Sequence, residues 1–261
     1  MKVRELYIYP IKGMQGTSVQ SATVMERGFE HDRRFMLIDE TDTFISQRTH
    51  PILVLFKPII ENKTLKVHYK EKQIEVSLNA SLGNTIVTNL FEHKVPSTEV
   101  DLHVNAWFSE IIGQKVRLVK MEDQNIRKKE LIKGPKSVEV SFADGYPYLI
   151  VGTESLERLN QELDQSVAIN RFRANIIVET SVPHIEDSWE DVKIGDTQLF
   201  VVKPCARCQV ITIDQSTGHK SNATLKALST YRKSENKIFF GANAVQIQEG
   251  IIKVGDEVQP L

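Results

Sequence analysis

Residues 34–48 read Arg34-Phe35-Met36-Leu37-Ile38, then Asp39-Glu40-Thr41-Asp42-Thr43, then Phe44-Ile45-Ser46-Gln47-Arg48. The outer runs hold large apolar side chains typical of strands and the middle run holds turn-forming polar residues, so the stretch predicts a β-hairpin. Residues 65–78 predict a second hairpin, because runs at 65–69 and 74–78 alternate in polarity around Lys70-Glu71-Lys72. Upstream, residues 3–9 predict a strand that ends at Pro10.

The rest of the chain continues this β character, with helices between the strands. Further strands are predicted at residues 146–151, 175–179, 198–202 and 209–214, and a closing hairpin at 251–258. Helices are predicted to begin at Asn105, Thr153 and Asn222, which are residue types that cap helix N-termini, and the first helix to end at Gly113. Many short strands with isolated helices favour a mainly β, barrel-like fold with a few α-helices.

A basic run in the middle of the chain marks the predicted domain boundary. Residues 125–135 contain Arg127, Lys128, Lys129 and Lys133 and interrupt the alternating pattern. We therefore place one domain at residues 1–124 and a second at residues 125–261. A solvated loop explains the basic run better than a partner-docking patch.

Composition excludes several classes of function. The 261 residues carry 33 Lys+Arg and 34 Asp+Glu, so no global positive field attracts nucleic acid. No apolar run approaches the ~18 residues of a membrane span and no signal-peptide core follows Met1, so we expect a cytoplasmic protein that does not act on membranes. Two cysteines are too few for a disulfide framework or a four-thiolate iron–sulfur cluster.

Both cysteines fall in the segment Pro204-Cys205-Ala206-Arg207-Cys208. A structural zinc site is disfavoured because the seven histidines are scattered singly. A thioredoxin-like pair is disfavoured because it normally opens a helix, whereas residues 209–214 alternate like a strand. Two interpretations stay open: a thiolate ligand to the metal of a cofactor, with Arg207 adding positive charge, and two buried, unreactive thiols.

Several short segments occur together in an order that points to a family. They are Tyr9-Pro10-Ile11-Lys12-Gly13, Asp32-Arg33-Arg34-Phe35, Asn170-Arg171-Phe172-Arg173-Ala174-Asn175, Glu186-Asp187-Ser188-Trp189, Cys205-Ala206-Arg207-Cys208 with Asp214 and Thr217-Gly218, Leu228-Ser229-Thr230-Tyr231-Arg232 and Lys253-Val254-Gly255-Asp256. With these segments the chain resembles the MOSC family, named for the C-terminal domain of the molybdenum cofactor sulfurase, in the branch of the mitochondrial amidoxime reducing component. The resemblance covers nearly the whole chain.

The resemblance implies a MOSC N-terminal β-barrel-like domain at residues 1–124 and a MOSC domain at residues 125–261. It also implies the molybdenum cofactor, a pyranopterin dithiolene that carries molybdenum. Position in the family motif selects Cys208 as the catalytic thiolate ligand of the metal, with Cys205 as a neighbour. The cofactor then supplies the two-electron oxygen-atom chemistry, and the protein supplies one bond and the electrostatics.

By the same resemblance, Lys12, Arg34 and Arg173 hold the phosphate and pterin of the cofactor, Lys as a compact charge and Arg as a planar fork. The other expected cofactor-binding residues are Gly13, Gly145, Tyr146, Asn175 and Arg207, and Arg48 is as well explained by a surface role. Relatives place hydroxyl residues at Gly145 and Tyr146, and a serine can occur at Gly13. Backbone amides are therefore expected to replace some side-chain hydrogen bonds.

Two carboxylates, Asp144 and Asp214, are nearest to the matched motifs. Either could be catalytic, by supplying protons or by orienting an oxygen ligand of the metal. For Asp214 a turn-capping role before Gln215 is the stronger interpretation. Trp189 is better explained as a core anchor than as a stacking surface.

Three hypotheses about function follow. The first is a molybdenum-dependent oxidoreductase that reduces N-hydroxylated compounds such as amidoximes, hydroxylamines or N-hydroxylated bases. Because the chain lacks the cysteines of a fused ferredoxin-like domain, electrons must come from a separate ferredoxin-, flavodoxin- or cytochrome-type protein. The second is a carrier of the cofactor, or a sulfur-transfer protein with a persulfide on Cys208, without substrate turnover. The third is a β-barrel binding protein with inert thiols.

Overall fold

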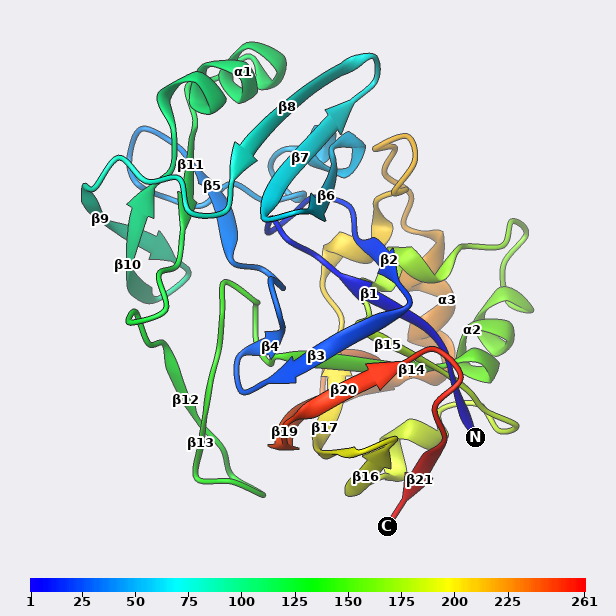
Figure 1. Cartoon of the computed structure of the whole chain (residues 1–261). Coiled ribbons are helices and arrows are strands. Elements are labelled where there is room, and N and C mark those ends of the chain that lie inside the picture. The colour runs from blue at the N-terminus through cyan, green and yellow to red at the C-terminus, as the bar shows by residue number, and fades with distance from the viewer.

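The computed structural model describes all residues, 1–261, and shows a mainly β protein with 21 strands and three α-helices (Figure 1). The predicted fold class is therefore confirmed. The two chain termini lie near each other at one side of the molecule.

A nine-stranded sheet forms the larger part of the molecule, in the order β2-β1-β15-β14-β19-β17-β16-β21, with β18 paired to β19. Its strands are β1 (Lys2–Ile8), β2 (Thr17–Val19), β14 (Tyr148–Gly152), β15 (Ile176–Glu179), β16 (Asp191–Ile194), β17 (Thr197–Ala206), β18 (Lys233–Ser234), β19 (Lys237–Gln248) and β21 (Val258–Pro260). All neighbours are antiparallel except β14 and β15. Strands β1 and β2 lie before residue 124 in the chain and pair within a sheet built otherwise from residues after it.

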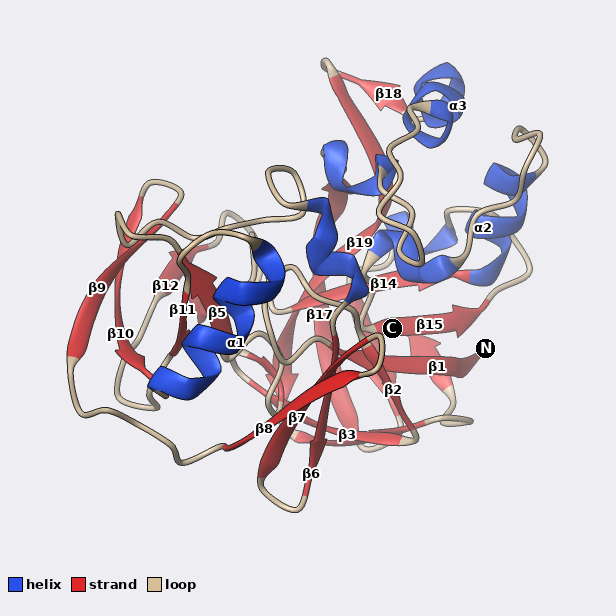
Figure 2. Ribbon diagram, turned by 90° about the horizontal axis from the view of Figure 1, so that it is seen from above, coloured by secondary structure: helices blue, strands red, loops and turns tan.

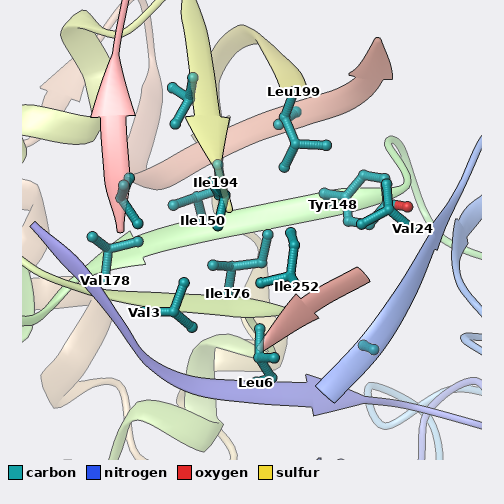
Figure 3. Close-up of a cluster of buried hydrophobic side chains, with 14 of the residues drawn as sticks. Val3, Leu6, Val24, Tyr148, Ile150, Ile176, Val178, Ile194, Leu199 and Ile252 are labelled. Carbon is teal, nitrogen blue, oxygen red and sulfur yellow. The ribbon is translucent and has the colours of Figure 1, made fainter. Parts of the chain in front are cut away.

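The core of this sheet is a cluster of 19 buried residues (Figure 3). Val3 and Leu6 of β1 both face the cluster, although they are three residues apart, because the pairing with β15 is irregular between Val3 and Glu5. There they meet Ile176 and Val178 of β15. Burial of each such side chain contributes about 1.5–3 kcal/mol. Trp189 belongs to this cluster at 6% exposure, so its predicted role as a core anchor is confirmed.

A second β-rich part contains a four-stranded sheet, β5-β11-β10-β9, and a three-stranded sheet, β6-β7-β8 (Figure 2). The elements are β5 (Phe35–Ile38), β6 (Lys57–Glu61), β7 (Thr64–Tyr69), β8 (Lys72–Ser77), β9 (Thr85–Leu90), β10 (His93–Glu99), α1 (Leu102–Ile112) and β11 (Arg117–Lys120). Phe56 packs against Trp107 and Phe108 of α1 in a separate core of 16 buried residues. The predicted hairpin at residues 65–78 is confirmed as β7 and β8.

The predicted hairpin at residues 34–48 is only partly correct. Its first arm is β5, and its second arm is reduced to an isolated bridge between Ile38 and Phe44. The Asp39 carboxylate accepts hydrogen bonds from the backbone of Thr41 (2.8 Å) and Thr43 (3.0 Å), which fixes the turn. Beyond Phe44 the chain leaves the sheet and forms loop and 3-10 structure instead of a strand.

The remaining small sheets are β20-β3-β4 and β12-β13. Their strands are β3 (Ser21–Met25), β4 (Gly28–Phe29), β12 (Lys128–Glu130), β13 (Ser137–Glu139) and β20 (Gly250–Lys253). The predicted closing hairpin is wrong, because β20 pairs with β3 and β21 pairs with β16. The basic run is also not a simple loop, since it forms the hairpin β12–β13 with Leu131 packed against a buried cluster.

The predicted helix starts are correct to within one residue for α2 (Thr153–Asn160) and α3 (Ala223–Tyr231), where Asn222 is the N-cap residue of α3, but α1 begins one turn earlier than predicted. Asp101, not Asn105, caps α1 by accepting a hydrogen bond from Val104 N at 2.9 Å. Asn105 is buried inside α1, where its Oδ1 accepts from Leu118 N at 2.7 Å. Helices α2 and α3 follow Gly152 and Asn222, and neither residue makes a side-chain cap. The predicted end of α1 at Gly113 is confirmed, with φ 74°.

Candidate functional site

A cavity of about 340 Å³ lies between the two parts of the chain. Its walls come from distant segments, which are residues 12–13, Arg33, residues 44–48, 143–149, 172–175, 203–210 and Asn243. The Gln47 side chain helps to join the parts, because its Nε2 donates to Gly13 O at 2.7 Å and to Gln215 Oε1 at 3.3 Å.

Positive charge dominates the cavity wall. Six cations line it, Lys12, Arg33, Arg48, Arg173, Lys203 and Arg207, against one carboxylate, Asp144. A low-dielectric wall strengthens the field of these charges. The cavity is therefore suited to an anionic ligand.

Lys12 is buried at the cavity wall, just after the proline that follows β1. Its Nζ donates to Phe142 O at 2.8 Å and contacts the Asp144 carboxylate. Burial lowers the pKa of Lys12, although Asp144 favours the charged form. The cavity wall partly desolvates the Asp144 carboxylate, which opposes its ionisation although the side chain is 63% exposed, but the Lys12 ammonium lowers the pKa of Asp144 to about 2. Asp144 is thus ionised at neutral pH and accepts rather than donates protons.

The structure places Arg33, not Arg34, at the cavity. Arg33 lies in a turn with φ 51°, and its Nη1 donates to Asn175 Oδ1 at 3.2 Å. Arg34 points elsewhere, since its Nη2 donates to Met121 O and ion-pairs with Asp123, both at 2.7 Å. The expected cation of this motif is supplied by the neighbouring residue.

Arg33 and Arg173 both approach the ring of buried Tyr9. Their guanidinium carbons lie 4.5 Å and 4.4 Å from the ring centroid. Burial lowers the pKa of Arg173 to about 10, with Arg33 adding to this effect. Arg173 has no carboxylate within ion-pair distance, and its one hydrogen bond is donated to Met14 O. It is a cation held in place without a countercharge.

Asn175 lies at the cavity, but the chain already uses its hydrogen-bonding groups. Its Nδ2 donates to Tyr7 O and Asp32 Oδ1, both at 3.2 Å, and its Oδ1 accepts from Arg33 and from Leu149 N at 3.4 Å. The side chain is 1% exposed. Asn175 therefore positions Arg33 and Asp32, and its expected part in binding the cofactor stays a prediction.

Cys205 and Cys208 both line the cavity at the end of β17. Register shifts between Pro204 and Ala206 in the pairing with β19 bend the strand there. Cys208 is exposed and Cys205 is half-buried, which contradicts the interpretation of two buried thiols. The predicted strand at residues 209–214 is wrong, because Gln209–Thr212 forms a 3-10 turn. One such turn still lacks the long helix of a thioredoxin-type site.

Arg207 is held between the two cysteines. Its Nη2 donates to Phe172 O at 2.8 Å, and its Nη1 donates to Cys205 Sγ at 3.1 Å. Its Nε is buried and has no hydrogen-bond partner. An incompletely satisfied guanidinium in a cavity wall has bonding capacity for a bound acceptor.

The other predicted residues divide between the cavity and the surrounding structure. Gly13, Gly145, Tyr146 and Arg48 line the cavity, and Lys129 Nζ lies 4.2 Å from the centroid of the Tyr146 ring. Asp214 does not line the cavity. Its Oδ1 accepts hydrogen bonds from Ser216 N and Thr217 N, both at 3.0 Å, and its Oδ2 pairs with Arg171 at 2.9 Å. The geometry gives Asp214 the turn-capping role.

The cavity residues that were not among the predicted site residues include two cations and an aromatic ring, Arg33, Lys203 and Phe44. Arg33 stands next to Arg34 in the same motif, but only the backbone of the turn decides which guanidinium faces inward. Phe44 lies in the quoted hairpin segment, and Lys203 lies two residues before Cys205. Neither has a chemical signal of its own.

Comparison with known families decides the kind of protein. Residues 137–259 match the family model of the MOSC domain, and residues 1–115 match that of the MOSC N-terminal beta barrel domain. This chain belongs to the MOSC family.

Relatives of this MOSC protein have two kinds of name. The molybdenum cofactor sulfurase of Danio rerio is 26% identical over 98% of the chain, which spans only 34% of that protein. The mitochondrial amidoxime-reducing component 1 of Mus musculus is 29% identical over 98% of the chain, which spans 81% of it. Among solved structures, the YUAD protein from Bacillus subtilis is 10% identical in sequence and aligns with a TM-score of 0.45. The alignment covers 98% of this chain and 93% of the YUAD chain.

The residues at the cavity fit a cofactor that brings a metal on an anionic scaffold. No three His, Cys, Asp or Glu side chains come together, so a metal here would depend on ligands that a cofactor brings. One exposed thiol, at Cys208, lies at a cavity with an excess of cations, as a metal with an anionic scaffold demands. The unpartnered Arg207 Nε offers a further donor.

The three α-helices of the MOSC protein are too short to span a bilayer.

Proposed function

We propose that this MOSC protein is a molybdenum cofactor-dependent oxidoreductase that reduces N-hydroxylated compounds. One observation carries the proposal: the exposed Cys208 thiol shares a cavity with six cations and a single carboxylate. The extent of the similarity to the amidoxime-reducing component, which the chain matches over 81% of that protein, supports the reaction class. The chain spans only about a third of the molybdenum cofactor sulfurase of Danio rerio, so this match gives less support to a sulfurase activity.

The residues of the chain have separate parts in this function. Cys208 Sγ is the proposed metal ligand, and Arg33, Arg173 and Arg207 provide the donors for the phosphate and pterin. When bound, the cofactor supplies two-electron oxygen-atom chemistry. Lys12 Nζ holds a proton at the cavity wall, and ionised Asp144 fixes the position of that ammonium. We propose a separate electron-transfer protein as the donor.

A second candidate function is transfer of the cofactor or of sulfur without substrate turnover. The exposure of Cys208 favours it, because a persulfide carrier must present its sulfur to a partner. The matches to molybdenum cofactor sulfurases point the same way. This candidate predicts labile cofactor or sulfane sulfur and no catalysis.

Two variants distinguish these functions. The protein is purified from a host that makes molybdenum cofactor, its molybdenum is measured by mass spectrometry, and reduction of an N-hydroxylamine is followed with reduced methyl viologen. We expect Cys208→Ser to lose metal and turnover with the fold intact, whereas Cys205→Ser, which removes the neighbouring thiol, keeps the metal. Metal-free parent protein, or equal metal in both variants, would contradict the proposal. Parent protein that carries molybdenum but does not reduce the N-hydroxylamine would favour the second candidate.

A further inference from the structure

The hairpin β12–β13 carries positive charge that the proposed function does not use. It lies at the lower left edge of the molecule in Figure 1. Four of its lysines and one lysine of β17, here named the basic face, form no ion pair: Lys128, Lys129, Lys133, Lys136 and Lys203. The ion-paired lysines lie elsewhere and are Lys12, Lys66, Lys72, Lys115 and Lys120. Of the two carboxylates of the hairpin, Glu139 pairs with Arg27 at 2.6 Å, so only Glu130 opposes the positive charge.

The hairpin packs on the protein through its apolar side, which leaves three of its lysines exposed. Val138 is buried, and Leu131 packs with it in a cluster that contains Phe200 of β17. Gly134 lies in the turn with φ 78°, and a Cβ atom there would approach the Phe200 ring to 2.5 Å. Only glycine permits this close contact between the turn and β17. The basic face is therefore held in place before a partner binds.

The basic face extends to the rim of the cavity. Lys129 Nζ and Lys203 Nζ lie 4.2 Å and 5.4 Å from the centroid of the Tyr146 ring, and both Tyr146 and Lys203 line the cavity. Burial lowers the pKa of Lys129, and repulsion from Lys203 and Arg127 adds to this effect. Like charges gathered at one place cost free energy unless opposite charge covers them. The charge is thus concentrated where a partner would lie next to the cavity.

The turn of the hairpin adds an apolar contact, since Ile132 is completely exposed. Protein interfaces combine apolar contacts with a charged rim. A single-stranded nucleic acid would need exposed aromatic rings for base stacking, and a membrane surface would need Trp or Tyr anchors, but the hairpin has neither. A protein with an acidic surface is therefore the partner that fits best.

We propose that the basic face is the docking site of the protein that donates electrons, and that this partner has acidic side chains around its redox centre. The inference rests on the proposed function and deepens it, because it assigns the donor a surface. Reduction of one N–OH group to N–H and water takes up two electrons and two protons, and the docked partner supplies the electrons. Docking at the rim brings the redox centre of the partner next to the cavity and leaves the cavity free for cofactor and substrate.

The test compares electron donors that must dock with one that need not. Reduction of an N-hydroxylamine by the holoenzyme is followed with a reduced acidic ferredoxin, flavodoxin or b-type cytochrome, and with reduced methyl viologen. The variant Lys128→Gln/Lys133→Gln/Lys136→Gln removes three exposed charges outside the cavity. For at least one protein donor we expect its KM to rise roughly tenfold at low salt, because each exposed charge pair contributes a factor of a few. The kcat and the rate with methyl viologen stay unchanged.

A matched variant removes the same charge from other surfaces. Lys2→Gln/Lys57→Gln/Lys193→Gln changes exposed lysines of β1, β6 and β16 that form no ion pair. We expect it to leave the KM for each protein donor within about twofold of the parent, because the substituted charges lie outside the docking site. Both triple variants keep the melting temperature of the parent, since the substituted side chains are exposed.

The apolar contact is tested separately with Ile132→Ser. We expect the KM for the protein donor to rise at least about threefold at low and at high salt, because salt does not screen an apolar contact. Ile251→Ser, which changes a half-exposed isoleucine of β20, is the control and leaves this KM unchanged.

Binding without turnover separates a failure of the docking site from a failure of the proposed function. Binding of each oxidised donor to the purified protein is measured by calorimetry. Equal effects of the two triple variants, or methyl viologen-active protein that binds none of the three donors, would overturn the docking site. Lysine-dependent sedimentation with phosphatidylglycerol vesicles without donor binding would also overturn it, in favour of a membrane surface. Donor binding that depends on Lys128, Lys133 and Lys136 in a protein without molybdenum would contradict the proposed function and leave the docking site standing.

Discussion

Two groups of partly buried cations behave differently in this molecule. Away from the cavity, Arg27 pairs with Glu139 at 2.6 Å and Arg232 pairs with Asp187. At the cavity, Arg173, Arg207 and Lys203 have no carboxylate within ion-pair distance; Arg207 donates to a carbonyl and a sulfur instead.

The difference separates cations that a carboxylate neutralises, among them Lys12 with Asp144 and Arg33 with Asp32 at the cavity, from cations that have no carboxylate partner. A paired cation stabilises the fold only together with its partner, whereas an unpaired one in a low-dielectric wall costs free energy unless a ligand supplies the negative charge. The four following experiments test this contrast, from the largest expected effect to the smallest.

Removal of a paired cation should destabilise the protein most. Arg27→Met leaves Glu139 poorly solvated without a partner, and we expect a loss of about 2–4 kcal/mol in the free energy of unfolding. Urea denaturation measures this loss, and molybdenum content per chain should not change. The double variant Arg27→Met/Glu139→Leu should recover most of the stability. A double variant as unstable as the single one would contradict a charge-pairing origin.

Removal of an unpaired cation should affect ligand retention more than stability. For Arg173→Met we expect at least about a tenfold loss of bound molybdenum, because a charge-assisted contact disappears. The free energy of unfolding of the cofactor-free protein should change by no more than about 1 kcal/mol, since removing a buried, unpaired cation offsets the lost contact with Tyr9. If Arg173→Met is strongly destabilised but keeps its molybdenum, Arg173 stabilises the fold and does not bind the cofactor, which would contradict the contrast between paired and unpaired cations.

Acid should expose the structural role of Asp214. Hydroxyl hydrogen bonds from Ser216 and Thr217, with their backbone amides, lower the pKa of Asp214 from 3.8 to about 2. A lowered pKa stabilises the fold above about pH 4, and this contribution is lost as the pH falls through 2. Because Asp214 is partly exposed, we expect Asp214→Asn to lose less stability than the parent between pH 5 and pH 2, by on the order of 1 kcal/mol. Parallel pH profiles of the two proteins would refute this role.

The smallest effect should come from the exposed pair of Arg34 with Asp123. Asp123 has a side chain that is 92% exposed, so Arg34→Met should cost at most about 1 kcal/mol and leave molybdenum content unchanged. Arg33→Met, one residue earlier, should lower the molybdenum content. Equal metal loss in both variants would contradict the assignment of the cavity cation to Arg33.

Much of the fold could be predicted from local patterns. Alternation predicted β1, β7 and β8, and a β-branched run predicted β15, to within a residue or two, and Gly113 marked the end of α1. The predictions failed where local and tertiary preferences conflict. Residues 209–214 alternate like a strand but form a 3-10 turn, because β17 bends at its bulges and ends at Ala206. Residues 251–258 were predicted to form a hairpin, but β20 pairs with β3 and β21 pairs with β16.

The functional site was also predictable only in part from the sequence. Residue types and motif order were enough to select Cys208, Lys12, Arg173 and Asp144 as candidates, and all four line one cavity. They were not enough to choose between Arg33 and Arg34, since that choice depends on a left-handed turn that the sequence does not signal. Residue types and motif order also could not show that the Asn175 side chain forms its hydrogen bonds with Arg33, Asp32 and the backbone.

By itself, then, the sequence determined a mainly β chain, its family and the thiol at the centre of its chemistry, because these depend on residue type and order along the chain. Only the tertiary structure decided which cations lack a countercharge and which residues line the cavity. Ion pairing and cavity lining depend on contacts between residues that are far apart in sequence, and no local pattern encodes those contacts.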